Sequence, residues 1–263
     1  MDSDGAFRFL QLFLMNELNS TDLQNAATIM DQHEINELWL LHLSDSALPI
    51  GSTAHSFGLE TMVESGLLDV GRLQEFLTDY LEESGVLEGT FCAAAHRLVS
   101  PRKATFEDEW ISLNNRLGAY RPARESRTAS ATLGRRFLSL VAEMTGLTDV
   151  REVVTRAGTI GTEIHHSAAF GLVGGILGID EKITVRAFLH QSLTAMISSC
   201  QRLLPLGQVL ASRILWNLKP EICRVSILCV SEASLPDRPV SFTPSIEMGA
   251  MRHPALRTRL FIS

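Results

Sequence analysis

The sequence predicts an all-α fold, a single-domain bundle of about nine helices with an extended C-terminal tail. Apolar residues recur at helical spacing in long segments, and 45% of the 263 residues are hydrophobic, which is enough to fill a sizeable core. Short loops join the segments, as in helical bundles. The one β-like run, Val225 to Val230, is equally compatible with a helix. We divide the chain into a leader (1–33), a helical domain (34–231) and a tail (232–263).

The first half of the chain begins with the leader, which is polar and weakly patterned. It is either partly disordered or carries one appended helix over Phe7 to Leu18. From Glu34 onward the spacing of the apolar residues becomes helical. This spacing predicts four helices, at Ile35–Leu43, Asp69–Leu81, Phe91–Val99 and Phe106–Leu117.

One of the two clearest helical patterns follows, between Glu125 and Thr145. One side of this segment is apolar, with Ala129, Leu133, Phe137, Leu140, Val141 and Met144. Gly146 comes just after the segment and is the expected C-cap, because glycine adopts the left-handed conformation without steric cost. A shorter helix is predicted at Val150–Ala157.

The longest apolar run, Ser167 to Ile179, overlaps a helix predicted at Gly161–Leu177. The run is well short of the roughly 20 residues that cross a bilayer, so it is interpreted as a buried core helix. The other clear pattern is Thr184–Leu204, which Thr184 can cap and Pro205 ends.

A last helix is predicted at Leu206–Leu218. Beyond Ser231 several prolines occur among serine and threonine residues, which predicts an extended, mobile tail.

Composition excludes several classes of protein. The net charge of -7 argues against a nucleic-acid binder, which presents a basic surface. The four cysteines are spread along the chain and form no C-x-x-C pair, which argues against a disulfide framework or a zinc site. The start of the chain lacks the basic residues and cleavage site of a signal peptide. We therefore expect a cytoplasmic protein that binds neither nucleic acid nor a membrane.

Common catalytic motifs are absent. The sequence has no phosphate-binding loop, no G-x-S-x-G elbow and no H-E-x-x-H pair. His165 and His166 are adjacent, so on a helix they point about 100° apart and cannot chelate one metal as an i, i+4 pair does. We expect no metal site, a hydrogen-bonded histidine at the edge of the core, and no enzymatic activity.

An alternative hypothesis is a metal-dependent or serine-type hydrolase. In the turn-rich segment Leu43–Glu60, His55 and Asp45 would act as base and orienting group, and Ser56 as nucleophile. The same polar side chains could instead cap helix ends and hold the turn in place. The sequence leaves both interpretations open.

Four blocks of sequence, in order, resemble the urease accessory protein F family. They are SDSALPIGSTAHSFGLE from Ser44, ESRTASATLGRRFL from Glu125, the stretch from HHSAAFGLVGGILGI through AFLHQSLTAMISSCQRLLPLGQ, and the terminal MRHPALRTRLFIS. Together they span roughly residues 35 to 263. The chain has Ser52 where the family usually has glycine, His166-Ser167 where an aromatic residue is usual, and Ile262 where a basic or polar residue is usual.

The resemblance implies a non-catalytic, all-α scaffold that forms a homodimer. It also implies binding to the D/H-type urease accessory protein and recruitment of the nickel-carrying G-type GTPase, which leads to nickel insertion into apo-urease. Nickel and GTP would then be handled by the partners, with no cofactor bound directly by this chain. The tail is expected to become ordered on binding the D/H-type partner.

The resemblance also assigns roles to particular residues. A partner-binding role is implied for Arg252, His253, Leu256, Arg259, Leu260 and Phe261 in the tail, and for Asp45, Ser56 and Glu60 in the first block. A dimer-contact or structural role is implied for Pro49, Gly51, Gly58, Arg202, Pro205, Gly207 and Gln208.

Overall fold

The computed structural model describes residues 35–98, 104–146, 148–233 and 244–263, and it confirms the all-α fold. These ranges contain helices and no strand. The predicted leader lies outside the described residues. Helices α3 to α13, together with a helix at 35–43, slightly exceed the predicted number.

The first half of the described chain contains the helix at 35–43 and five further helical elements. These five are η1 (Ser52–Ala54), α3 (Leu59–Glu64), α4 (Leu73–Tyr80), the π-helical turn η2 (Leu81–Gly85) and α5 (Val86–His96). The last three follow one another without a break, so the predicted gap between the helices at Asp69–Leu81 and Phe91–Val99 is wrong. The wider π turn keeps the helix continuous through this stretch.

The second half is also helical. Its elements are α6 (Phe106–Ala119), α7 (Arg124–Thr145), α8 (Thr148–Ile160), α9 (His166–Ile176), α10 (Glu181–Leu203), α11 (Gln208–Asn217), α12 (Lys219–Glu232), α13 (Pro244–Arg252) and η3 (His253–Ala255). The ambiguous run Val225 to Val230 lies within α12. Gly146 caps α7 with φ +65°, as predicted, whereas Met144, which was predicted on the apolar side, is 45% exposed.

Several predicted boundaries differ from the structure, and two of them have a clear local cause. The helix predicted at Gly161–Leu177 is interrupted, because Gly161 has φ +72° and α9 begins only at His166. Helix α10 begins earlier than predicted, and its N-cap is Asp180, whose carboxylate accepts a hydrogen bond from the backbone N–H of Ile183 at 2.9 Å.

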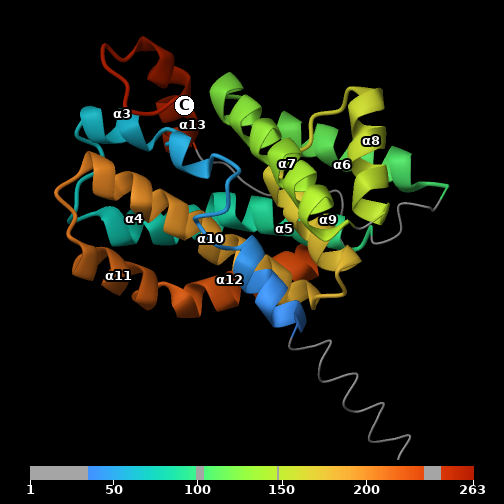
Figure 1. Cartoon of the computed structure of the whole chain (residues 1–263). Coiled ribbons are helices and arrows are strands. Elements are labelled where there is room, and N and C mark those ends of the chain that lie inside the picture. The colour runs from blue at the N-terminus through green and yellow to red at the C-terminus, as the bar shows by residue number, and fades with distance from the viewer. Residues whose placement is uncertain (1–34, 99–103, 147, 234–243) are drawn as a thin grey trace, which may run out of the picture.

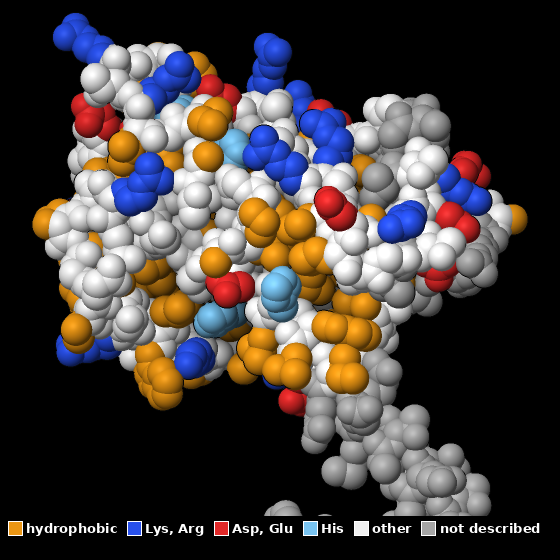
Figure 2. All heavy atoms as spheres, viewed as in Figure 1, with side chains coloured by type: hydrophobic (Ala, Val, Ile, Leu, Met, Phe, Trp, Pro, Cys, Tyr) orange, Lys and Arg blue, Asp and Glu red, His pale blue; other side chains and the backbone are white. Residues whose placement is uncertain are grey.

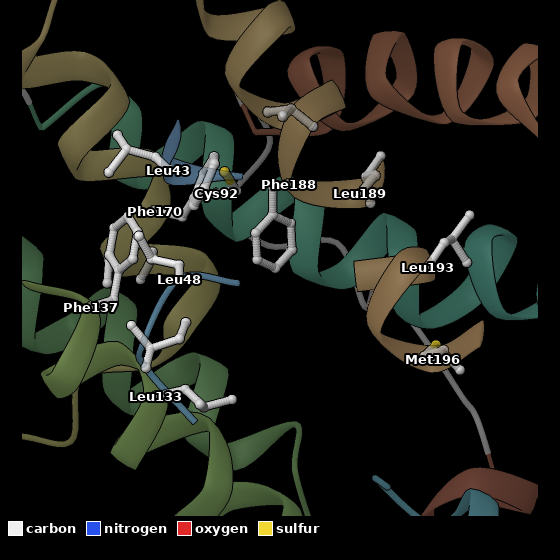
Figure 3. Close-up of a cluster of buried hydrophobic side chains, with 14 of the residues drawn as sticks. Leu43, Leu48, Cys92, Leu133, Phe137, Phe170, Phe188, Leu189, Leu193 and Met196 are labelled. Atoms are coloured by element: carbon white, nitrogen blue, oxygen red, sulfur yellow. The ribbon is translucent and has the colours of Figure 1, made fainter. Parts of the chain in front are cut away.

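The core lies where α5, α9, α10 and α12 cross, with α7 packed beside α9 (Figure 1). Helices α5 and α9 are in very close contact, since a Cβ placed on Gly171 would lie 1.9 Å from the carbonyl oxygen of Cys92. Phe137, Phe170 and Phe188 bring α7, α9 and α10 together in one aromatic cluster (Figure 3).

The sequence predicted an extended tail, but part of the tail is helical. Residues Pro244–Arg252 form α13, which packs against α3 and α7, and the residues after it return to the loop before α3 (Figure 1). The prolines suggested an open chain, but Pro244 occupies the first turn of α13, where the absence of an N–H costs no helical hydrogen bond.

Candidate protein-binding site

The turn before α3 is shaped by two glycines. Gly51 and Gly58 have φ values of +85° and +89°, a conformation that favours glycine. Asp45 Oδ1 accepts a hydrogen bond from the backbone N–H of Ala47 at 2.8 Å, and Pro49 is exposed beside it. The first block thus forms a turn that depends on Gly51 and Gly58, and the roles implied for Pro49, Gly51 and Gly58 stay predictions.

Gly58 also allows α13 to approach α3. A Cβ on Gly58 would lie 2.7 Å from the carbonyl oxygen of Ile246 and 2.8 Å from the nitrogen of Ala250. On the facing helix, a Cβ on Gly249 would lie 2.8 Å from the carbonyl oxygen of Gly58. The two backbones therefore touch with no side chain between them.

Glu60 is the main anchor of the tail. Its side chain is buried, and it accepts hydrogen bonds from the backbone N–H of Leu260 at 2.6 Å and of Phe261 at 3.1 Å. Burial raises the pKa of this carboxyl, but these N–H groups and the His253 ring outweigh it, so the pKa of Glu60 lies below its usual value. Glu60 is therefore an ionised acceptor at neutral pH.

His253 links the tail to two helices. Its ring is fully buried, with Nε2 2.9 Å from Glu60 Oε2 of α3 and Nδ1 2.8 Å from Glu125 Oε2 of α7. Arg259 lies 3.7 Å from the other oxygen of Glu125. Three segments that are distant in sequence are thus joined through one imidazole.

The final residues run beside the loop before α3. The backbone N–H of Ile262 donates to the carbonyl oxygen of Ala54 at 2.9 Å, and the N–H of Ser56 donates to a backbone oxygen of Ser263 at 2.5 Å. Inner and outer side chains alternate here: Phe261 is 4% exposed, whereas Leu260 and Ile262 are 53% and 69% exposed.

Arg202 of α10 covers the inner side of this segment. Its guanidinium carbon lies 4.2 Å from the centre of the Phe261 ring, and its Nη1 donates to the carbonyl oxygen of Thr53 at 2.8 Å. A cation over an aromatic face is attractive. Arg202 thus ties the tail to the body, while Pro205, Gly207 and Gln208 form the junction between α10 and α11, with Gly207 as N-cap.

The outward side chains of the tail define what we call the outer face: Met248, Met251, Arg252, Arg257, Arg259, Leu260 and Ile262, all exposed. The upper part of the molecule, where α3, α13 and the start of α7 lie, carries several basic side chains (Figure 2). Exposed arginine and methionine beside aliphatic residues are characteristic of protein interfaces. This basic, apolar surface contrasts with the net charge of -7.

The implied partner-binding residues thus fall into two groups. Asp45, Arg252, Arg259 and Leu260 are exposed and Leu256 is half-buried, whereas His253, Phe261, Ser56 and Glu60 are buried against the protein itself. A direct partner contact by any of them stays a prediction.

The hydrolase arrangement is not assembled. Asp45 is exposed and bonded to its own loop, while His55 Nδ1 lies 2.7 Å from Ser263 Oγ. Ser56 Oγ is buried and has no hydrogen-bond partner within the described ranges. Because no described base faces the Ser56 hydroxyl and no described carboxylate orients His55, the geometry of residues 35–98, 104–146, 148–233 and 244–263 gives no support to nucleophilic catalysis.

His165 is hydrogen-bonded, as predicted, but it is fully buried and does not lie at the edge of the core. Its backbone N–H donates to Asn114 Oδ1 at 2.9 Å, and its Nδ1 lies 3.2 Å from Ser130 Oγ. Burial, with Arg121 and Arg127 nearby, lowers the pKa of His165 to about 3.

In the described part of the chain, no group of three or more His, Cys, Asp or Glu residues could hold a metal ion. No helix of the described residues is long and apolar enough to span a bilayer.

Sequence reasoning missed a cavity and two of the tail's anchoring residues. The cavity has a volume of about 210 Å³, and residues of α13 form part of its wall. Ser56, Arg121 and Gln191 line other parts of it. Glu247 lines it from α13, and its carboxylate accepts a hydrogen bond from the backbone N–H of Ala123 at 2.9 Å. Glu125 was also missed. Neither carboxylate had a sequence signal, because each partner lies more than a hundred positions away.

Comparison with known proteins gives a consistent result. The model of the family described as UreF matches residues 67–219. The chain is 35% identical over 193 residues to the urease accessory protein F of Oryza sativa subsp. indica, covering 72% of this chain and 70% of the rice protein. It is 30% identical over 230 residues to the urease accessory protein UreF of Geobacillus kaustophilus, covering 86% and 97%. It is 29% identical over 241 residues to that of Trichormus variabilis, covering 90% and 98%.

Proposed function

Since the chain belongs to the UreF family of urease accessory proteins, we propose that it acts as a non-catalytic scaffold in urease maturation. In this proposal it binds the D/H-type accessory protein and recruits the nickel-carrying G-type GTPase. The assembly then inserts nickel into apo-urease in the cytoplasm, while nickel and GTP are handled by the partners. The chain itself would act as a homodimer.

The outer face of the tail is the observation that carries this proposal. It combines exposed apolar side chains, such as Leu260 and Ile262, with three exposed arginines. Apolar side chains give affinity when a partner buries them, and arginines form bidentate pairs with carboxylates. The D/H-type protein would therefore dock on this face with an apolar patch bordered by acidic residues.

The inner side of the tail supports the same proposal. Glu60, His253 and Phe261 hold residues 244–263 against α3, α7 and α10. A surface held in one conformation loses less entropy on binding than a free chain does. The sequence-based expectation of folding on binding is replaced in this proposal by docking onto a tail that is already folded.

The test is co-purification of the chain with a D/H-type accessory protein. We expect capture by the full chain and none by a form that ends at Thr243. Because truncation also uncovers α3, a double variant, Leu260→Asp and Ile262→Asp, changes only exposed side chains of the tail. This variant should lose capture while its helical circular dichroism stays unchanged, and full capture by both altered forms would exclude the tail as the docking site.

A further inference from the structure

The clearest feature left unexplained by partner binding is the position of His253. Both of its ring nitrogens face carboxylate oxygens, Glu60 Oε2 at 2.9 Å and Glu125 Oε2 at 2.8 Å, and the ring is fully buried. A neutral imidazole has one N–H and one lone pair, whereas an ionised carboxylate can only accept. Both contacts are hydrogen bonds only when this group of three side chains holds one extra proton.

The surroundings of this group are well defined. Glu60 comes from α3, Glu125 from α7 and His253 from η3. Arg259 of the tail is the other charged side chain ion-paired to these groups among the described residues, 3.7 Å from Glu125 Oε1. Glu60 also accepts the backbone N–H groups of Leu260 and Phe261, so the placement of this carboxylate fixes the course of the tail.

We propose that Glu60, His253 and Glu125 form a one-proton latch that holds residues 244–263 on α3 and α7. These three are positioning residues, because they hold the outer face in place without belonging to it. Loss of the proton turns a ring lone pair toward a carboxylate oxygen in a buried site, where repulsion is poorly screened. The undocked tail needs no such proton.

The sign of the pH effect follows from proton linkage. Above the usual pKa of a free histidine, about 6.5, the docked state binds one proton more than a tail whose histidine is neutral and free, so docking is complete below that pH and weakens as pH rises above it. Linkage to a single proton lowers the docking equilibrium constant by up to about tenfold per pH unit. The expected change is release of the tail, with the helical body left intact.

The experiment uses the full chain without any partner. Hydrogen exchange followed by NMR gives protection factors for the backbone amides of Leu260 and Phe261 from mildly acidic to alkaline pH. In the unaltered chain we expect protection to fall with rising pH by up to about tenfold per unit, while amides of α10 stay protected. Imidazole nitrogen shifts should show both nitrogens of His253 protonated where the tail is docked.

One variant separates the latch from simple packing. Glu125→Gln places an amide beside Nδ1, and an amide can donate to that lone pair while Nε2–H donates to Glu60. Docking should then persist without the extra proton, so protection of Phe261 should be flat across the pH range. Glu143→Gln, the same change at an exposed position of α7, is the matched control and should keep the original profile.

Two further results complete the test. His253→Gln should lose protection at every pH, since its amide oxygen would face a carboxylate. A flat profile in the unaltered chain, or parallel profiles for it and Glu125→Gln, would overturn the latch. The latch and the proposed function are separable: if the protein is not a D/H-type binder, amide protection still follows pH but no partner is captured at any pH.

Discussion

Replacing Gly58 by alanine tests the contact between α3 and α13 most directly. Gly58 has φ +89°, and a side chain in left-handed backbone costs roughly 1–2 kcal/mol. The added Cβ would also lie 2.7 and 2.8 Å from two backbone atoms of α13, which cannot rotate away. Forcing such a contact costs a further 1–3 kcal/mol or so. The two costs together destabilise the structure with a docked tail by about 2–5 kcal/mol. Undocking of α13 would remove the part that comes from the contact.

Gly66 provides a matched control. It also has positive φ, +70°, and lies just after α3, but a Cβ there meets nothing within 4 Å. Gly66→Ala should therefore show the backbone strain alone, and the difference between the variants isolates the contact with α13. That difference of about 1–3 kcal/mol corresponds to a roughly 5- to 150-fold shift in tail docking.

The assay is limited digestion with trypsin, which cleaves after Arg257 or Arg259 when the tail is released, together with urea denaturation of each variant. We expect faster cleavage of the tail in Gly58→Ala and a rate close to that of the unaltered chain in Gly66→Ala. Equal cleavage rates in the two variants would refute the close approach of α3 and α13 as the reason for glycine at this position.

Three other predictions concern the helical body. Gly171→Ala should lower the free energy of unfolding by about 3 kcal/mol or more in urea titrations, because its Cβ would collide with the α5 backbone at Cys92; Gly178→Ala, at an open position, should cost only the backbone strain. Burial, with Arg121 nearby, lowers the pKa of His166 to about 4. The unfolded chain therefore binds one proton more than the folded chain once pH falls below about 6.5. The free energy of unfolding decreases as pH falls from about 6.5 to about 4. His166→Phe keeps a ring in the aromatic cluster and should make that loss shallower by up to about 1.4 kcal/mol per pH unit; an unchanged slope would show that His166 does not titrate there. Burial raises the pKa of the Cys200 and Cys229 thiols to about 12, so iodoacetamide at neutral pH should label the partly exposed Cys223 first, as checked by mass spectrometry.

Local patterns were sufficient for much of the fold. Helices α6, α7 and α11 lie within a few residues of the positions that apolar spacing predicts, since residues three and four apart share a helix face whatever surrounds them. The glycines of the turn before α3 and the cap at Gly146 were also readable, because positive φ depends on the residue itself. Boundaries were missed at Gly161, where a positive φ breaks the predicted helix, and at Asp180, which caps α10 so that it begins at Glu181, before the predicted start at Thr184.

The sequence alone therefore determined the helical class, most of the helices and the family. It did not determine which side of the tail packs against the rest of the protein. His253 and Phe261 were predicted to contact a partner. They are instead buried beside Glu60, which lies 193 and 201 positions away from them in the sequence. The roles of Glu125 and Arg202 in holding the tail were likewise hidden until α7 and α10 came together with it. Periodicity reports only on neighbours within a helix, whereas hydrogen bonds between distant segments depend on how the helices pack, and only the tertiary structure decides that.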